Sequence, residues 1–510
     1  MSFDAVSGDV TLALVGTGAM GRGIAQIAAQ AGMTVLLYDV QPGAAAQARA
    51  TLADTLTSLV TKGRITAEAA GAALARLRVV EGLSEVADAQ VVVEAIIEDL
   101  AVKQQLFREL EGIVSADCVL ATNTSSLSVT AIAAACARPQ RVAGFHFFNP
   151  VPLMKVVEVI DGVRTDPAVG EALLALGRRM GHAAVRAKDT PGFIVNHAGR
   201  GYGTEALRLL GENIAEPSTV DDILREQAGF RLGPFELLDL TGLDVSVPVM
   251  ESIYRQYFEE PRYRPSALAA QRKLAGLLGR KTGEGYYRYA DGHAVKPPAA
   301  PPPSARPRSV WLSRAEPALA TAAAALLDRL GAVLEADARP SDEALIIVTP
   351  LGEDVTARCL REGLDARRTV ALDLLVPNER RRTLMLSPST SAQARDQAHG
   401  LLASDGARVS VVRDSAGLVT QRVLATIVNI GCDIAQQGIA TPEDIDRAVT
   451  LGLGYPHGPL AWGDRLGART VLTILERLLA STGDPRYRPS PWLRRRALLD
   501  LPLTHAEPSI

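Results

Sequence analysis

The sequence predicts an α/β domain with a parallel sheet, then an all-helical domain, a shortened α/β segment and a second copy of the helical domain. Three observations support this prediction. Short apolar runs alternate with helix-length segments over about the first 185 residues. A proline-rich stretch interrupts the chain near its middle, and an offset of about 225 residues aligns two distant helical segments with each other.

Length and composition agree with several folded domains and exclude some classes of function. At roughly 150 residues per domain, 510 residues correspond to about three folding units. The apolar share of 47% is typical of a globular protein, and the net charge of −3 gives no field that would hold nucleic acid or an acidic membrane. No run of 18 uninterrupted apolar residues occurs. We therefore expect neither nucleic acid nor membrane as a partner.

The four cysteines and the N-terminus bear on location and on metals. The cysteines lie far apart, without a CxxC pair or a histidine-rich neighbourhood, so we expect neither a disulfide framework nor a metal site. Residues 1–9 lack the basic and then apolar layout of a signal peptide. These features favour a cytoplasmic protein.

The first predicted domain spans residues 1–187. Apolar runs at residues 10–15, 35–38, 91–97, 119–121 and 142–148 predict its strands, and the segments between them are long enough for crossover helices. From residue 191 to 278 helical periodicity dominates, so we assign residues 188–294 to a helical domain.

The second half begins after a predicted linker at residues 295–308, which contains the run PPAAPPPSARPR. Apolar runs at residues 344–349, 369–374, 383–386 and 409–412 predict strands in a degenerate α/β segment, residues 309–410. Residues 342–364 loosely echo residues 88–110. We assign residues 411–510 to the second helical copy.

The repeat is carried by matched residue types at a nearly constant spacing. At the repeat offset, the residues Asp189, Gly192, Asp221, Gly229, Gly233, Pro234, Asp239 and Gly242 align with Asp414, Gly417, Asp446, Gly454, Gly458, Pro459, Asp464 and Gly467. The motif PRYRPS occurs at Pro261 and again at Pro485, one position short of the same offset.

A glycine motif follows the first predicted strand. Gly16, Gly18 and Gly21 have the G-x-G-x-x-G spacing at a strand-to-helix turn, which is typical of dinucleotide binding in Rossmann-like domains. The next strand ends at Asp39, where a carboxylate can accept hydrogen bonds from a ribose diol and would repel a 2′-phosphate. The motif therefore predicts NAD rather than NADP as cofactor.

Four further blocks follow this motif in order: VVVEAIIEDLAVKQ, TNTSSLS, GFHFFNPVPLMKVVEV and KDTPGFIVNH. Together they resemble the L-3-hydroxyacyl-CoA dehydrogenase family, densely over residues 9–290 and loosely in the repeat. The resemblance is greatest to long, single-function bacterial forms, which include 3-hydroxyadipyl-CoA dehydrogenases of phenylacetate breakdown. It implies oxidation of (S)-3-hydroxyacyl-CoA, such as 3-hydroxyadipyl-CoA or 3-hydroxybutyryl-CoA, to 3-oxoacyl-CoA with NAD.

His146 and Glu158 form the expected catalytic pair. The prolines at positions 150 and 152 turn the chain, so that the following strand can return and bring Glu158 behind the imidazole. A histidine with a carboxylate behind it is a competent general base. The resemblance assigns both residues to catalysis, whereas a histidine in an aromatic strand can also be a satisfied core group.

The resemblance also implies contacts with substrate and cofactor. Ser125 and Asn196 match polar contacts to the reacting oxygens, and hydroxyl and amide donors suit a growing negative charge there. Lys62 resembles a contact to a CoA phosphate. Structural alternatives are caps and solvated helix faces. The positions that resemble cofactor contacts are Glu98, Lys103, Asn123, Asn149 and Lys281.

Two functions other than 3-hydroxyacyl-CoA oxidation remain open. A hydroxyacid or nucleotide-sugar dehydrogenase would ask for a catalytic lysine in the helical domain or a nucleophilic cysteine, and an inactive NAD-binding protein would not need the polar set above. In the second copy Gln421 replaces Asn196, so we expect one active site. The chain is either a homodimer or a monomer whose two helical copies form an internal pseudo-dimer.

Overall fold

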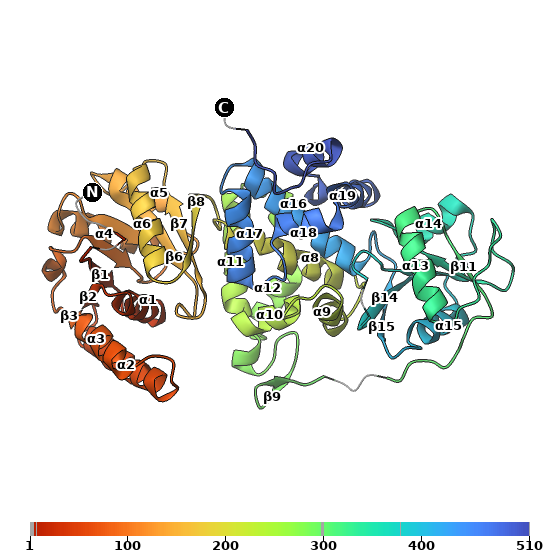
Figure 1. Cartoon of the computed structure of the whole chain (residues 1–510), viewed down its shortest axis with the longest axis horizontal. Helices are drawn as coiled ribbons and strands as arrows, with labels where there is room; N and C mark the ends of the chain where they lie inside the picture. Colours follow the sequence, from red (N-terminus) through yellow and green to blue (C-terminus); the bar gives the residue numbers. More distant parts are fainter. Residues whose placement is uncertain (1–4, 7, 297–299, 378, 509–510) are drawn as a thin grey trace. The chain divides into compact units, whose positions relative to one another are not determined.

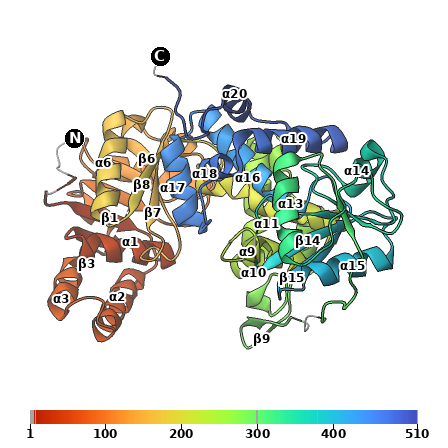
Figure 2. The same cartoon turned by 45° about the vertical axis from the view of Figure 1, so that its right-hand side comes forward.

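The computed structural model describes residues 5–6, 8–296, 300–377 and 379–508 (Figures 1 and 2). Part of the N-terminal segment and the first three residues of the proline-rich run lie outside these ranges. The chain divides into two compact units, and the division cuts across the predicted domain boundaries. The first unit contains Met1–His197 together with Gln437–Gly454, and the second contains Ala198–Gln436 and Tyr455–Ile510.

An eight-stranded sheet forms the centre of the first unit, with strand order β3-β2-β1-β4-β5-β6-β7-β8. Neighbouring strands are parallel except β6 and β7, which are antiparallel. The strands are β1 (Thr11–Val15), β2 (Thr34–Tyr38), β3 (Leu77–Val79), β4 (Val91–Glu94), β5 (Val119–Thr122), β6 (Val142–Phe147), β7 (Val156–Asp161) and β8 (Ala183–Lys188).

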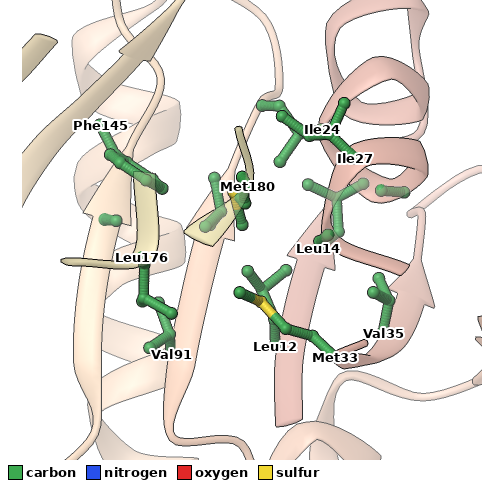
Figure 3. Packing of buried hydrophobic residues seen from close by; sticks show 14 of the residues in the cluster. Leu12, Leu14, Ile24, Ile27, Met33, Val35, Val91, Phe145, Leu176 and Met180 are labelled. Carbon is green, nitrogen blue, oxygen red and sulfur yellow. The ribbon is translucent and has the colours of Figure 1, made fainter. Parts of the chain in front are cut away.

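Both faces of this sheet are covered, as its apolar strands require. One buried cluster joins the sheet to α1 (Ala19–Gln30) and α6 (Pro167–Arg179), with α2 (Ala44–Thr61) and α3 (Ala67–Arg76) at its margin. Figure 3 shows Ile24 and Ile27 of α1 beside Leu14, and Leu176 beside Val91. On the opposite face lie α4 (Leu100–Ile113) and α5 (Val129–Ala133).

The sequence predicts six of these eight strands; it gives no signal for β3 or β8, and one predicted run is longer than its strand. The run at residues 91–97 forms a strand only as far as Glu94. There the chain leaves the sheet, and the Glu94 carboxylate accepts a hydrogen bond from the backbone of Ile96 at 2.7 Å. The three-residue strand β3 escapes prediction because it is too short to show an apolar period.

The first helical copy lies mostly in the second unit. Its helices are α7 (Val195–Ala198), which spans the unit boundary, α8 (Arg200–Gly211), α9 (Pro217–Glu226), α10 (Pro234–Thr241), α11 (Leu243–Gln256) and α12 (Ala267–Leu274), and a short hairpin of β9 (Tyr289–Ala290) and β10 (His293–Ala294) follows.

The degenerate segment forms a five-stranded sheet of order β11-β12-β13-β14-β15. Buried residues of α13 (Pro317–Arg329) and α15 (Ala392–Leu402) form one core with this sheet, and α14 (Val355–Glu362) connects two of its strands. The strands are β11 (Val310–Leu312), β12 (Leu345–Val348), β13 (Thr369–Leu372), β14 (Arg381–Leu386) and β15 (Arg408–Arg413).

This smaller sheet repeats the β4 to β8 half of the first one. Its sequence of parallel, parallel, antiparallel and parallel pairs is the same, and β14 and β15 follow β7 and β8 at the offset of the helical repeat. By this order β12 matches β5, which corrects the expected match of residues 342–364 with residues 88–110. Among the described residues no strand corresponds to β1, β2 or β3, so the half that carries the glycine turn is missing.

The second helical copy repeats the helices of the first, with α16 in the place of α7 and α8. Its helices are α16 (Val419–Gln436), α17 (Pro442–Leu453), α18 (Pro459–Leu466), α19 (Ala468–Thr482) and α20 (Pro491–Leu499). Of these, α17 belongs to the first unit, where it packs against β7 and β8.

The two copies contact each other inside the second unit. Helix α8 packs along α16, where a Cβ on Gly201 would lie 3.0 Å from the Cα of Ile427 (Figure 1). The two PRY turns also touch. Arg262 of the first copy pairs with Asp433 of the second at 2.5 Å, and buried Glu205 of the first pairs with Arg422 at 2.7 Å.

Candidate active site

The glycine turn has the geometry that dinucleotide binding requires. Gly16 has φ +97°, and a Cβ there would lie 2.6 Å from the carbonyl oxygen of Ala95. A Cβ on Gly21 would lie 1.9 Å from the oxygen of Gly16, so α1 can approach the turn only with glycine at this position. Gly18 precedes α1 and faces open space, with no atom within 4 Å of its Cβ position. That opening at a helix N-terminus fits a pyrophosphate.

Asp39 lies beside this turn at the end of β2. Its carboxylate accepts hydrogen bonds from the backbone and hydroxyl of Thr17, both at 2.8 Å, and from the backbone of Gln41 at 3.0 Å. Burial alone would raise the pKa of Asp39, but these hydrogen bonds lower it, so the group is a carboxylate at neutral pH. Thr17 was not predicted as a site residue, although a hydroxyl side chain inside the glycine motif could have indicated a contact with Asp39.

A cavity of about 790 Å³ opens along the turn. Gly16, Gly18 and Asp39 line it on one side. The other side is mainly apolar and includes Ile97, Val102 and Leu106. Apolar walls beside a carboxylate fit an adenine ring and its ribose, so the residues present fit NAD.

Glu98 organises the loop after β5. Its Oε1 accepts hydrogen bonds from the backbone of Ser125 at 2.8 Å and of Ser126 at 3.0 Å, and from their hydroxyls. Burial alone would raise the pKa of Glu98, but the charge of Lys103 and these donors outweigh it, so the pKa lies below its ordinary value. Lys103 is 1% exposed and lies between Glu94, at 2.5 Å, and Glu98, at 3.4 Å. It therefore supports the loop from beneath, and its direct contact with cofactor stays a prediction.

His146 and Glu158 face each other across β6 and β7. The antiparallel register pairs them directly, and the imidazole Nδ1 lies 2.7 Å from Glu158 Oε2. His146 is 4% exposed and Glu158 is fully buried. The aromatic rings of Phe148 and Phe193 flank the imidazole. The expected meeting of the two side chains is confirmed, and its cause is the cross-strand pairing.

The second oxygen of Glu158 is also held. Oε1 accepts hydrogen bonds from the backbone of Ile194 and Val195, each at 2.9 Å, where α7 begins. One residue further, the Asn196 amide donates to the carbonyl oxygen of Ser125 at 3.4 Å. The structure thus links His146 to Glu158 and Ser125 to Asn196. The two backbone donors cannot be predicted from the sequence, because every residue except proline has a backbone N–H group.

The remaining predicted cofactor contacts lie in three places. Asn123 accepts a hydrogen bond from the backbone of Phe147 at 2.8 Å and so ties the ends of β5 and β6 together. Asn149 is exposed just beyond β6. Lys281 lies in the second unit and pairs with Asp244 at 2.8 Å. The contacts of these residues with NAD stay predictions.

Lys62 lines a second cavity of the first unit, of about 620 Å³. Arg64, Lys155 and Arg179 also line it, and none of its described lining residues is acidic. A cavity with four cations suits the phosphates of a CoA. Arg64 and Lys155 were not singled out from sequence, since exposed cations are common and their spacing does not show that they converge.

In the second half, the four positions equivalent to the polar set carry other residues. The order and register of the strands place Asp373 where the first sheet has His146, and Thr383 where it has Glu158. Leu351 replaces Ser125, and Gln421 replaces Asn196. Thr383 donates to Gln227, and Gln421 bonds to the backbone of Pro350 and Gly352. These four positions of the second half therefore lack the polar set, and a single active site in the first unit stays the prediction.

No group of three or more His, Cys, Asp and Glu side chains that would suit a metal ion occurs in the described ranges. Within the described residues, no helix is both long enough and apolar enough to cross a membrane.

Comparisons with known proteins agree with this site. Residues 11–190 match the model of the 3-hydroxyacyl-CoA dehydrogenase NAD-binding domain, and residues 192–289 and 417–501 match that of the C-terminal domain. The 3-hydroxyadipyl-CoA dehydrogenase of Escherichia coli K12 is 39% identical over 96% of this chain and 98% of its own length. Human mitochondrial hydroxyacyl-coenzyme A dehydrogenase is 38% identical over 54% of this chain and 90% of its own.

Solved structures give the same assignment. The crystal structure of 3-hydroxybutyryl-CoA dehydrogenase from Escherichia coli K12 superposes with a TM-score of 0.85 at 37% identity, covering 97% of this chain and 99% of that one. The (S)-3-hydroxybutyryl-CoA dehydrogenase of Ralstonia eutropha, at 37% identity and a TM-score of 0.54, covers 56% of this chain. The chain belongs to the 3-hydroxyacyl-CoA dehydrogenase family and is an NAD-dependent oxidoreductase that oxidises 3-hydroxyacyl-CoA.

Proposed function

We propose that His146 is the general base of this dehydrogenase and that Glu158 orients it. The observation that carries the proposal is the 2.7 Å contact between His146 Nδ1 and Glu158 Oε2 in a buried cross-strand pair. With Nδ1–H donating to the carboxylate, Nε2 keeps its lone pair and can accept the proton of the 3-hydroxyl group. The carboxylate then stabilises the imidazolium that forms.

Ser125 and Asn196 complete the proposed site as neutral donors. Their loop and helix are joined by the bond from Asn196 to the Ser125 carbonyl, so the two side chains can act on one oxygen atom. A hydroxyl and an amide stabilise an alkoxide without titrating themselves. NAD supplies the hydride acceptor for C3, so the hydroxyacyl-CoA loses a proton and a hydride and becomes a 3-oxoacyl-CoA.

We further propose that the cationic cavity at Lys62 takes phosphate groups of CoA. Lys62, Arg64 and Lys155 are exposed, whereas Arg179 is partly used in hydrogen bonds to the backbone of Gly8 and Ala31. Three exposed ammonium and guanidinium groups in one cavity attract a polyanion, because no lining carboxylate competes for them.

For the acyl group we propose 3-hydroxyadipyl-CoA first and 3-hydroxybutyryl-CoA second. The match over 96% of this chain to an enzyme named 3-hydroxyadipyl-CoA dehydrogenase favours the former. Relatives named 3-hydroxybutyryl-CoA dehydrogenase favour the latter. The phenylacetate pathway and a cytoplasmic location are part of this proposal. The four cysteines are buried and form no disulfide, which agrees with a reducing compartment.

The test is a rate comparison over 3-hydroxyacyl-CoAs of several chain lengths, with and without a terminal carboxylate, followed by NADH absorbance. The highest kcat/KM for the six-carbon dicarboxylic substrate supports the first proposal. A preference for 3-hydroxybutyryl-CoA supports the second, and a preference for long unsubstituted chains would contradict both.

A further inference from the structure

We propose that the second helical copy supplies a positioning residue to the active site. This residue is Gly452, near the end of α17, and it acts through Val195 on Glu158 and thereby on His146. The inference rests on the catalytic roles proposed above for His146 and Glu158.

The first observation is an unbroken set of contacts from Gly452 to the imidazole. A Cβ on Gly452 would lie 3.0 Å from both γ-carbons of Val195 and 3.5 Å from Val156, so the helix already touches this valine. The Val195 N–H donates to Glu158 Oε1 at 2.9 Å, and Oε2 of the same carboxylate holds His146. Movement of Val195 therefore moves the acceptor that fixes the imidazole.

The approach of this segment is set by the backbone. The Lys188 N–H at the end of β8 donates to the carbonyl oxygen of Ile439 at 2.9 Å, just before α17 begins. Within the helix, the Asp444 carboxylate accepts from the backbone of Arg186 at 3.4 Å. The start of α17 is thus tied to β8, and its end at Gly452 reaches Val195.

The repeat supplies the second observation, in the half without catalytic residues. There the Arg413 N–H donates to the carbonyl oxygen of Ile214 at 3.0 Å. At the repeat offset, Arg413 is the counterpart of Lys188 and Ile214 is the counterpart of Ile439, so this bond is equivalent to the Lys188–Ile439 bond. Each helical copy therefore docks on the sheet of the other half. The two bonds have the reciprocal form of an interface with twofold symmetry.

In that half, a side chain fills the position of Gly452. Gln227 follows α9 directly and is the counterpart of Gly452 at the repeat offset. Its oxygen accepts from the Thr383 hydroxyl at 2.8 Å, and its amide donates to the Asp373 carbonyl at 3.5 Å. Thr383 and Asp373 are the counterparts of Glu158 and His146. A side chain at this position thus reaches the catalytic pair, and glycine keeps the active half clear of it.

The experiment uses Gly452→Ala in the full-length chain. An added methyl group at 3.0 Å requires Val195 to give by a few tenths of an ångström. Because a misplacement of about 1 Å can cost about a hundredfold, a shift of this smaller size should lower turnover by up to about tenfold. We expect that fall in kcat, with the KM for NAD within about twofold of the parent, since the cofactor cavity does not touch α17. Alanine is the better helix former, so weakening of α17 itself would not explain the loss.

A second variant makes the route falsifiable. Val195→Ala removes both γ-carbons that the new methyl group meets. In the Gly452→Ala background it should restore kcat to within about threefold of the Val195→Ala single variant. Turnover of Gly452→Ala near that of the parent would overturn the proposal, and so would a loss that Val195→Ala does not relieve.

Two controls separate this inference from the proposed function. Gln227→Ala changes the equivalent position in the half without catalytic residues, and kcat should stay unchanged. A comparable loss there would show that any disturbance of a docked helix lowers turnover, which would overturn the specific role of Gly452. Full turnover of a His146→Gln variant would instead refute the proposed base, whatever Gly452→Ala does.

Discussion

The catalytic pair illustrates how side chains far apart in sequence become fixed neighbours. His146 and Glu158 are separated along the chain by a turn, and the antiparallel pairing of two strands sets them opposite each other. Burial removes competing water, so the carboxylate can hold one ring orientation. The two backbone donors on its other oxygen compensate for the cost of burying this charge.

Replacing His146 by Gln removes the base and keeps a polar side chain of similar size. We expect kcat to fall by about two to four powers of ten, the usual contribution of general acid–base catalysis. The affinity for NAD, measured by fluorescence titration, should change little because the cofactor cavity is formed by other residues. Turnover near that of the parent would remove His146 from the mechanism.

Asp39 is expected to determine the choice of cofactor. Replacing it by Ala removes a carboxylate that faces the cavity beside the glycine turn. Binding of NAD should weaken, and discrimination against NADP should relax, because the charge that repels a 2′-phosphate is gone. Steady-state kinetics with both cofactors measure this ratio, and an unchanged ratio would contradict the ribose role.

Among single residues, the sequence predicts those whose residue type is itself required by the chemistry of the site. The glycine spacing, Asp39 and the His146 pair are visible because the site needs those residue types. The ion pairs of buried Lys103 and the Val195 N–H donor are not visible in the same way. Burial and backbone direction depend on the fold, and neither is encoded in residue type.

Among the elements, α10 depends on two buried aspartates. Asp221 in α9 accepts hydrogen bonds from the backbone of Phe235 and Glu236 in the first turn of α10, and from the Tyr287 hydroxyl. Asp239 at the other end accepts from the backbone of Tyr286 and Tyr287. Of the repeated aspartates, Asp221 therefore caps α10 in this copy, and Asp239 ties α10 to the segment at residues 286–287.

Asp221 should make the stability of the helical region depend on pH. Burial raises its pKa to about 7, against hydrogen bonds that lower it, so the folded state binds a proton more tightly than the unfolded chain. Its stabilising contribution is complete below the unfolded value near 4 and is lost as pH rises to about 7.

The matched variant is Asp221→Asn, which stays neutral at every pH. It should be less stable than the parent because its amide nitrogen cannot accept the bonds that the carboxyl accepts. Its midpoint of thermal unfolding should also change less between pH 5 and pH 8 than that of the parent. Equal changes in both proteins would assign the pH dependence to other groups.

Helices and strands are predicted correctly where the apolar residues follow a clear pattern. The match between strands of the two sheets is not, because it depends on which strands pair. The four strands expected in the degenerate segment all form, because each contains a run of apolar residues. Their match to the first sheet had to come from topology: β12 resembles β4 in letters but takes the place of β5. Strand order depends on long-range pairing that a local echo does not report.

The molecule as a whole combines two unequal halves. The constant offset between matched residues predicts a second helical copy, and contact between the copies is expected of a pseudo-dimer. The crossed docking, in which α17 joins the first unit and α9 lies against β14, was not predicted. Sequence repeats reveal equivalent segments, but they do not show which copy of a helix packs on which sheet.

Because α8 is covered internally by α16, we expect the chain to be a monomer. The ion pairs of Glu205 and Arg262 with the second copy belong to this internal contact. Light scattering during size-exclusion chromatography should give a mass near 54.0 kDa over a wide concentration range. A constant value of twice that mass would favour the homodimer.

The position of α17 in the chain also has a consequence for synthesis. The strands of the NAD-binding sheet are complete at Lys188, but the helix that packs on them ends at Leu453. At the usual pace of translation, the ribosome needs on the order of tens of seconds to make the intervening residues. During that interval the surface of β7 and β8 that α17 covers is exposed in the nascent first domain, so we expect a chaperone that shields it to raise the yield of active enzyme.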